Sequence, residues 1–354
     1  RLLRYAALGL AAILLLSIVQ AIAGTSELTS SGTWAAAIRL AIPIMLAGLG
    51  GLFSERSGVV NIGLEGMMIA GTWFGAWAGW EFGPWYGVAF GIIGGAIFGL
   101  IHAIATVTFA VDHIVSGVAI NILAAGAMRF MSVVVYTPDT GGGATQSPRI
   151  QSQIGTFDLP LLSDAFNWIE DRAIFFLSDL AGLFAGFTTK MSWLTLVALV
   201  IIPLTWWALW RTPWGLRLRS CGENPYAAES LGVPVLRMKY YGVVISGALA
   251  GLGGAYLVVV QAGIYREGMT AGRGFIGLAA LIFGNWYPFG VAAGSSVFGY
   301  ADALSLRQGE AVHALLLVIA IALVLLAVWS FTRQKTTAAI IQAAGAAAFL
   351  TWYL

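Results

Sequence analysis

The 354-residue chain contains few charged side chains, with 18 Lys and Arg against 16 Asp and Glu, together 10% of the sequence. Soluble domains carry about a quarter charged residues, so this chain cannot cover a water-facing surface in the usual way. Hydrophobic residues make up 59% of the sequence, and the mean hydropathy is +0.86. These values indicate an integral membrane protein. The net charge of +2 gives no support for nucleic-acid binding.

Cysteine is nearly absent, and a phosphate-binding loop is missing altogether. The one cysteine, Cys221, excludes an internal disulfide framework and a multi-cysteine metal site. None of the three lysines, Lys190, Lys239 and Lys335, follows a glycine, so the chain has no G-x-x-x-x-G-K-[ST] motif. We therefore expect no cofactor in this chain. If ATP drives the activity of this protein, a partner must supply the site for ATP and Mg²⁺.

Apolar runs of about 20 residues, the length of a spanning helix, recur along the chain. A further apolar run, 274–304, is interrupted at 284–288 and predicts two short helices. The first run is expected to be a retained helix rather than a signal peptide. Together these runs predict an all-α polytopic membrane helix bundle of about ten spans. The continuous predicted spans are 2–23, 34–53, 59–80, 85–110, 114–135, 191–210, 239–260, 311–330 and 337–353.

The distribution of charge predicts the orientation. Segment 211–238 is rich in arginine and is expected to be cytoplasmic, because loops rich in Lys and Arg stay inside. Loop 136–190 holds six acidic and three basic residues, a balance of 3 − 6 = −3, and is expected to be external. Residues 1–354 are expected to form a single transmembrane domain.

Glycines at four-residue spacing recur within the predicted spans. Such stripes let helix backbones approach closely in a membrane, where no hydrophobic force drives helices together. We therefore expect close helix packing at these faces. The stripes comprise Gly71, Gly75 and Gly79; Gly87, Gly91, Gly95 and Gly99; and Gly247 and Gly251.

Two polar residues stand at the start of the third predicted span. A carboxylate within a membrane helix is costly and usually faces a cavity or a partner. One interpretation places Asn61 and Glu65 along a translocation pathway, beside helix breaks that Gly63 and Gly66 permit. In the other, Glu65 pairs with Arg56 or caps a helix.

Three further residues are candidates for the same pathway. Asn121 lies about two turns into its predicted span, where it either lines the pathway or bridges two helices. Phe275 follows a glycine-rich turn, and Trp286 interrupts the run 274–304. Both aromatic rings are candidates to stack on a flat ligand, or they serve as interfacial anchors.

The predicted cytoplasmic segment contains a short capped helix. Asn224 suits the cap, Pro225 the first turn and Gly232 the end. A short rigid helix on this surface is what a motor protein could push against. The candidate coupling residues are Gly222, Glu223, Asn224, Pro225, Ala227, Ala228, Glu229 and Gly232.

Several of these stretches together resemble one family. The run 50–68, which reads GGLFSERSGVVNIGLEGMM, resembles the signature of ABC importer permeases. It is most similar to the nucleoside-type branch of the family that also serves branched-chain amino acids and ribose. Three further stretches carry the resemblance, namely 112–121, 222–232 with 246–254, and 272–284.

The resemblance implies a type II-like importer in the bacterial cytoplasmic (inner) membrane. Its partners are a cytoplasmic ATP-binding subunit, a second permease chain that is often non-identical, and an external substrate-binding protein. The implied cargo is a nucleoside, moved by alternating access. The resemblance also places 222–232 at the coupling helix that docks into the ATPase. The chain itself is then a transport subunit and not an enzyme.

Three other functions remain open. An ion-gradient-driven secondary transporter also uses broken helices with an intramembrane carboxylate. Within the family that the sequence resembles, an ABC permease for a sugar or an amino acid is a second alternative. A purely structural membrane scaffold is disfavoured, because it has no use for a costly carboxylate such as Glu65.

Overall fold

The computed structural model describes residues 2–139, 141–307 and 309–353. Residues 1, 140, 308 and 354, which belong to the predicted single domain, lie outside the described residues. The helices are α1 (Leu2–Ala23), α2 (Ser31–Arg56), α3 (Leu64–Glu81), α4 (Pro84–Ala103), α5 (His113–Val135), α6 (Leu162–Glu170), α7 (Leu177–Thr188), α8 (Trp193–Arg211), α9 (Pro213–Glu223), α10 (Pro225–Ser230), α11 (Val235–Tyr256), α12 (Arg273–Phe283), α13 (Pro288–Ser305), α14 (Gly309–Thr332) and α15 (Thr336–Tyr353). The π-helical turns η1 (Ile104–Thr108) and η2 (Leu257–Ala262) extend α4 and α11.

The all-α class is confirmed. Within the described part of the chain, the sheet consists of two antiparallel two-residue strands, β1 (Thr156–Phe157) and β2 (Met191–Ser192). Thr156 lies opposite Ser192, and Phe157 lies opposite Met191. This pairing closes the base of the segment that was predicted as an external loop. That segment also contains α6 and the apolar helix α7.

The number of candidate spans in the described part of the chain differs from the predicted count of about ten. Among the described residues, six helices are long and apolar enough to cross a membrane: Ser31–Arg56, Pro84–Thr108, His113–Val135, Trp193–Arg211, Val235–Ala262 and His313–Thr332. The predicted span 59–80 yields only the 18-residue helix α3, which includes two glutamates. The run 274–304 divides into α12 and α13, as its interruption predicted. Apolar length alone therefore overestimates the spans where polar residues or helix breaks intervene.

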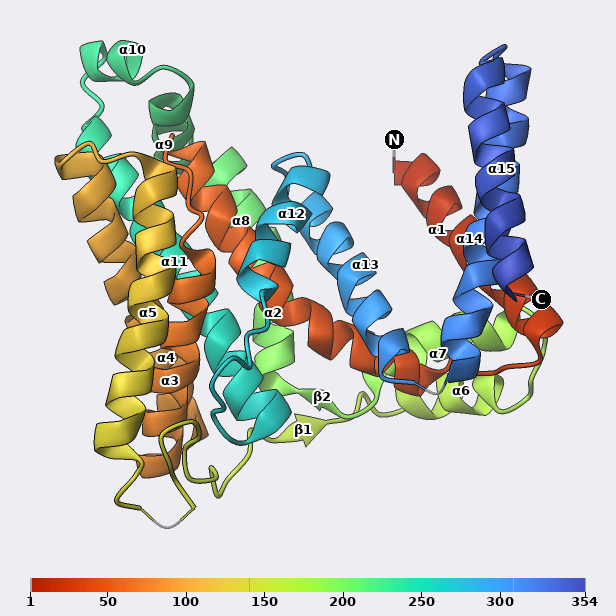
Figure 1. The fold of residues 1–354 in the computed structure, drawn as a ribbon, viewed down its shortest axis with the longest axis horizontal. Helices are drawn as coiled ribbons and strands as arrows, with labels where there is room; N and C mark the ends of the chain where they lie inside the picture. Colours follow the sequence, from red (N-terminus) through yellow and green to blue (C-terminus); the bar gives the residue numbers. More distant parts are fainter. Residues whose placement is uncertain (1, 140, 308, 354) are drawn as a thin grey trace. The chain divides into compact units, whose positions relative to one another are not determined.

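The chain forms two compact units. The first comprises Arg1–Ile38, Asp158–Lys190 and Tyr300–Leu354, and the second comprises Arg39–Phe157 and Met191–Gly299. Within the second unit, α3, α4 and α11 lie side by side (Figure 1). Within the first, α14 lies against α15, and α6 against α7. The assignment of 1–354 to one functional domain stays a prediction.

The glycine stripes bring α3, α4 and α11 into backbone contact, which confirms their predicted role. A Cβ atom built on Gly95 of α4 would lie 2.6 Å from the Cα atom of Gly251 in α11. A Cβ atom on Gly71 of α3 would lie 2.5 Å from the same Cα atom. Three backbones therefore meet at Gly251 with no room for a side chain.

The first unit has a core of its own. Val19 and Leu28, from α1 and the loop after it, are fully buried against Leu304, Ala314 and Leu317. This apolar cluster anchors α1 to α14 within the unit.

We predict that Gly95→Leu destabilises the second unit. The added side chain would overlap the backbone of α11, and overpacking typically costs about 1–3 kcal/mol. A lower midpoint of thermal unfolding in detergent is expected. Gly126→Leu is the matched control, because a Cβ atom on this α5 glycine meets nothing within 4 Å. Equal midpoints for the two variants would contradict the packing described here.

Candidate functional site

The polar residues predicted at the third span lie in the second unit, where the chain breaks between two helices. α2 ends at Arg56 and α3 begins at Leu64. Gly58 has a φ of +86°, a conformation that residues with a side chain rarely adopt. The Ser54 hydroxyl donates a hydrogen bond to the carbonyl of Val59 at 2.7 Å. The link between the helices therefore has a defined, non-helical conformation.

Glu65, in the first turn of α3, caps a different helix. Its side chain is largely buried, with the residue 7% exposed. Oε1 accepts hydrogen bonds from the Thr270 hydroxyl at 2.7 Å and the Gly272 amide at 3.0 Å, and Oε2 accepts one from the Gly274 amide at 2.7 Å. These groups surround the N-terminus of α12, whose first amides have no acceptor within the helix. The positive end of the α12 dipole also favours a carboxylate at this position.

Gly274 lies so close to Glu65 that a side chain at position 274 would not fit. A Cβ atom built on Gly274 would lie 2.5 Å from the Cα atom of Glu65 and 2.8 Å from its Oε2. Gly272 has a φ of +77°. Of the interpretations drawn from the sequence, the structure shows helix capping by Glu65.

Asn121 of α5 caps α3 in the same manner. Its Oδ1 accepts a hydrogen bond from the Gly66 amide at 2.7 Å, and its Nδ2 donates one to the carbonyl of Ile62 at 3.1 Å. Gly66 is in the first turn of α3, so its amide lacks a helical acceptor. The structure thus shows the helix-bridging role that the sequence suggested.

Asn61 is the most deeply buried of the predicted pathway residues, at 0% exposure. Its Nδ2 donates hydrogen bonds to Ser246 Oγ at 2.8 Å and to Met67 Sδ at 3.3 Å. Its Oδ1 has no hydrogen-bond partner among the described residues. A buried acceptor of this kind is costly. The pathway role of Asn61, like that of Glu65 and Asn121, stays a prediction.

The two candidate aromatic rings lie at opposite ends of α12. Phe275 is in the first turn, next to the Glu65 cap, and is 45% exposed. Trp286 lies beyond the last turn. The end of α12 at Phe283 is about 12 Å from Phe275 along the helix axis, at 1.5 Å per residue. Its indole Nε1 donates a hydrogen bond to Glu55. The structure therefore separates these residues, and their proposed contacts with a ligand ring stay predictions.

The predicted coupling helix forms with the expected boundaries. α10 runs over Pro225–Ser230, and Asn224 Oδ1 accepts a hydrogen bond from the Ala227 amide at 3.1 Å. Gly232 has a φ of +80°, as a helix-terminating glycine often does. Ala228 is buried against Cys221, Val235 and Met238. The predicted coupling residues that are exposed are Gly222, Glu223, Asn224, Ala227, Glu229 and Gly232.

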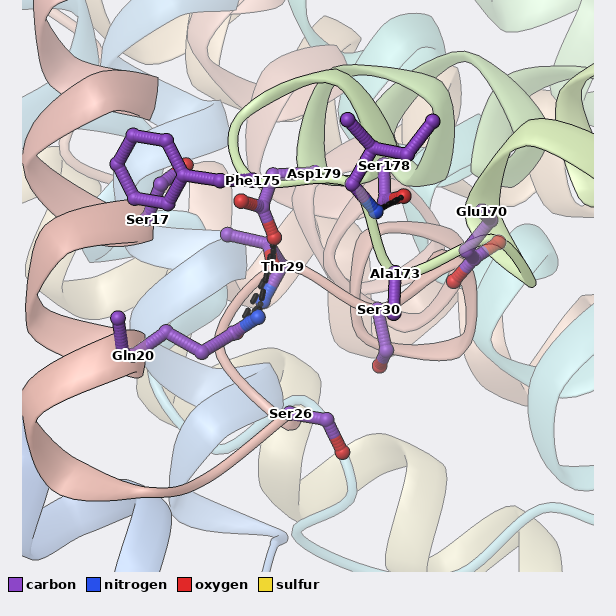
Figure 2. A pocket seen from close by; sticks show the side chains of 12 residues that line it. Ser17, Gln20, Ser26, Thr29, Ser30, Glu170, Ala173, Phe175, Ser178 and Asp179 are labelled. Atoms are coloured by element: carbon purple, nitrogen blue, oxygen red, sulfur yellow. Dashed lines mark hydrogen bonds between the residues drawn. The ribbon is translucent and has the colours of Figure 1, made fainter.

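The first unit contains a pocket of about 470 Å³ beside α1, α6 and α7, lined by both polar and apolar residues. Figure 2 shows Gln20, Thr29 and Asp179 joined by hydrogen bonds at its wall. Glu170 lines the pocket too, and its Oε1 accepts a hydrogen bond at 2.8 Å from the amide of Ser31, the first residue of α2. As with Glu65, an acidic side chain that is distant in the sequence accepts a hydrogen bond from an amide at the N-terminus of a helix.

The histidines carry structural hydrogen bonds. His102 is fully buried, with Nδ1 2.8 Å from Ser116 Oγ. His113 Nδ1 accepts a hydrogen bond from the Val60 amide at 3.3 Å. In the described part of the chain, no group of three or more His, Cys, Asp or Glu side chains could hold a metal ion.

The sequence of this chain is similar to sequences of known proteins. The model of the family described as "Branched-chain amino acid transport system / permease component" matches residues 33–328. The chain belongs to this family. It is therefore a multi-pass membrane transport subunit and not an enzyme, which confirms the resemblance stated from the sequence.

Three curated relatives cover most of the chain. A guanosine ABC transporter permease protein of Bacillus subtilis is 40% identical over 75% of this chain and 79% of its own length. A nucleoside ABC transporter permease protein of Lactococcus lactis is 38% identical over 76% and 80%, respectively. A putative glucose ABC transporter permease protein of Haloferax volcanii is 34% identical over 79% and 78%. No solved structure matches the chain significantly.

Several residues of the site were not identified from the sequence. Thr270 and Ser246, the partners of Glu65 and Asn61, lie more than 180 residues away along the chain. The glycines at 272 and 274 were the available signal, because they indicate a close approach of another group to the backbone.

We predict that Glu65→Gln lowers stability. A glutamine offers one carbonyl oxygen and one NH₂ group, so one of the α12 donors faces another donor whichever way the amide is turned. An unsatisfied buried donor costs about 1–3 kcal/mol. Thermal unfolding in detergent should show the loss. Glu81→Gln, at the exposed end of α3, is the control, and an equal midpoint for both variants would refute the capping role.

We predict slow maleimide labelling of Cys221 at neutral pH. Burial raises the pKa of its thiol despite opposing effects of Lys239 and Ser220, and the thiolate is the reactive form. Because the pKa is raised, Cys221 needs a more alkaline pH than an ordinary cysteine to reach the same thiolate fraction. The comparison is Tyr226→Cys in a Cys221→Ser background, since Tyr226 is 84% exposed. Equal labelling rates would contradict the burial of Cys221.

Proposed function

We propose that this chain is one permease subunit of an ATP-driven importer of nucleosides. The observation that carries the proposal is its 40% and 38% identity, over about three quarters of the chain, to permeases named for guanosine and nucleosides. The proposed partners are a cytoplasmic ATP-binding subunit, a second, non-identical permease chain and an external substrate-binding protein. The complex would lie in the bacterial cytoplasmic membrane.

The surface of α10 supports the proposed contact with an ATPase. Tyr226 in α10 and Leu231, the residue that follows the helix, are each 84% exposed, although both are large and apolar enough to anchor an interface. Ala228 on the opposite face is buried against the rest of the unit. A partner that grips Tyr226 and Leu231 would therefore move α9 and α11 with α10.

The broken helices support alternating access as the mechanism. α3 and α12 both begin at non-helical breaks, and each N-terminus is held by one side chain from another helix. Such joints are tolerated within a membrane only where protein groups satisfy the backbone. The partner ATPase would bind ATP and Mg²⁺, and force transmitted through α10 would shift α12 about its joint with α3.

A sugar is the second candidate cargo. The 34% identical relative is named as a putative glucose permease, so the same scaffold is associated with a different polar ligand. Nucleosides and sugars share hydroxyl groups, but only nucleosides add an aromatic base that can stack on a side chain.

Uptake into proteoliposomes tests the proposed function. The complex, purified with its partners, should accumulate radiolabelled guanosine only with ATP and the binding protein, and unlabelled adenosine should compete better than glucose or leucine. Uptake without ATP that collapses when ion gradients are dissipated would refute an ATP-driven mechanism. Preferential competition by glucose would favour the sugar permease.

We also predict that the double variant Tyr226→Ala, Leu231→Ala releases the ATPase. Removing two anchors that the proposed interface would bury costs about 2 kcal/mol or more of binding free energy, so the dissociation constant should rise at least about tenfold. Binding of purified ATP-binding subunit to the detergent-solubilised permeases measures this change. Leu236→Ala removes another exposed leucine (64%) outside α10 and serves as the control. Unchanged binding in the double variant would exclude α10 as the docking site.

A further inference from the structure

Two consecutive residues at the end of α2 hold one tryptophan from both sides. The indole Nε1 of Trp286 donates a hydrogen bond to Glu55 Oε2. The Nη2 of Arg56 donates one to the backbone carbonyl of Trp286 at 2.9 Å. We call Glu55, Arg56 and Trp286 the tryptophan clamp. It fixes both the side chain and the backbone of Trp286.

The clamp acts on a turn that is unfavourable by itself. Trp286 and its neighbour Asn285, between α12 and α13, both have a φ of +51°. A left-handed backbone is unfavourable for a bulky residue such as Trp286, so this turn depends on outside contacts. Gly284 and Gly290 pack backbone to backbone on the two sides of it. Loss of the clamp would let the turn relax toward another conformation.

Arg56 also reaches the segment that carries α10. Its Nη1 lies 3.9 Å from Glu223 Oε1, one residue before the α10 cap. Its guanidinium is 5.5 Å from the centre of the Trp210 ring, and Arg219 approaches the same ring at 5.5 Å. Backbone contact reinforces the link, because a Cβ atom on Gly222 would lie 3.0 Å from the carbonyl carbon of Arg56.

The contacts of Arg56 differ in strength. The side chain of Glu223 is 80% exposed, and ion pairs in water are worth about 0–1 kcal/mol. The bond to the Trp286 carbonyl is charge-assisted, and such bonds are about twice as strong as neutral ones. Arg56 itself is only 28% exposed. The grip on Trp286 and the packing around Gly222 therefore dominate over the ion pair.

We propose that Arg56 is a positioning residue that couples α10 to the turn between α12 and α13. A displacement of α10 moves Glu223 and Gly222, Arg56 transmits it to Trp286, and the turn then shifts α12. The opposite end of α12 is held by Glu65, so α12 pivots about that cap. This coupling rests on the proposed ATP-driven function. It also assigns Trp286 to force transmission and not to contact with the cargo.

The test compares nucleoside imported with ATP hydrolysed in the reconstituted full complex. Allosteric couplings of 1–3 kcal/mol correspond to about 5–150-fold effects. In Arg56→Ala we expect guanosine imported per ATP to fall at least about fivefold, while the ATP-binding subunit still co-purifies. Trp286→Phe removes the indole N–H group and its hydrogen bond to Glu55 but keeps an aromatic ring and the backbone carbonyl that Arg56 binds, so it should cause a smaller fall. Arg211→Ala, which removes an arginine 5.0 Å from the Trp206 ring, should leave the ratio unchanged.

Combining the variants checks that the residues act as a unit. The double variant Arg56→Ala, Trp286→Phe should be no worse than Arg56→Ala alone, because interacting residues are not additive. If Arg56→Ala does not assemble, Trp286→Phe still carries the test, since it keeps an aromatic side chain and the hydrogen bond from Arg56 to the backbone carbonyl.

Two results would overturn the clamp. One is an unchanged import-to-hydrolysis ratio in Arg56→Ala, or in Trp286→Phe where only that variant assembles. The other is a raised half-saturating guanosine concentration in Trp286→Phe with the ratio intact, which would make Trp286 a cargo contact. Failure of the wild-type complex to use ATP would instead refute the proposed function. The two ideas thus fail in different ways.

Discussion

Satisfaction of helix N-termini by side chains from other helices is the constraint on which this structure depends. Lipid provides no water for the first amides of a helix that begins inside the bundle, and each unsatisfied group costs several kcal/mol. Glu65 serves α12, and Asn121 serves α3. Glu170 serves α2 within the first unit. Without these groups, the helix breaks would not be stable.

The same constraint connects the fold to transport. Helix breaks are the places where a membrane bundle can bend without exposing its backbone to lipid. α3 takes part in two of these joints. Asn121 caps its own N-terminus, and its Glu65 caps the N-terminus of α12. Glycines pack α3 tightly against α4 and α11. A rigid three-helix core thus carries the pivot of a shorter helix, an arrangement suited to a part that moves against a fixed frame.

Local features of the site were predictable from the sequence. Asn224, Pro225 and Gly232 specify a short helix through capping and backbone preferences that involve only neighbouring residues, and α10 has these limits. The interruption at 284–288 predicted the separation of α12 from α13 for the same reason. The predicted span 59–80 was too long, because apolar length does not reveal where polar residues or breaks shorten a helix, as in α3.

Contacts across long stretches of chain were not predictable. The sequence placed Phe275 and Trp286 together as candidate ring-stacking residues, but α12 holds them at its two ends. It left Glu65 between a pathway, an ion pair with Arg56 and a helix cap. Arg56 instead contacts Trp286, 230 residues away. Nothing in the residues that neighbour Arg56 in the sequence indicates that it contacts Trp286.

By itself, the sequence determined that this protein lies in a membrane, where its helices break, which helix faces approach closely and which family it belongs to. These properties follow from composition, steric freedom at glycine and short motifs. Only the tertiary structure decided which side chain completes each broken helix and that Arg56 of α2 contacts both Glu223 and the turn after α12. The physical reason is that a buried polar group needs a partner in space, and the fold chooses that partner irrespective of its distance along the chain.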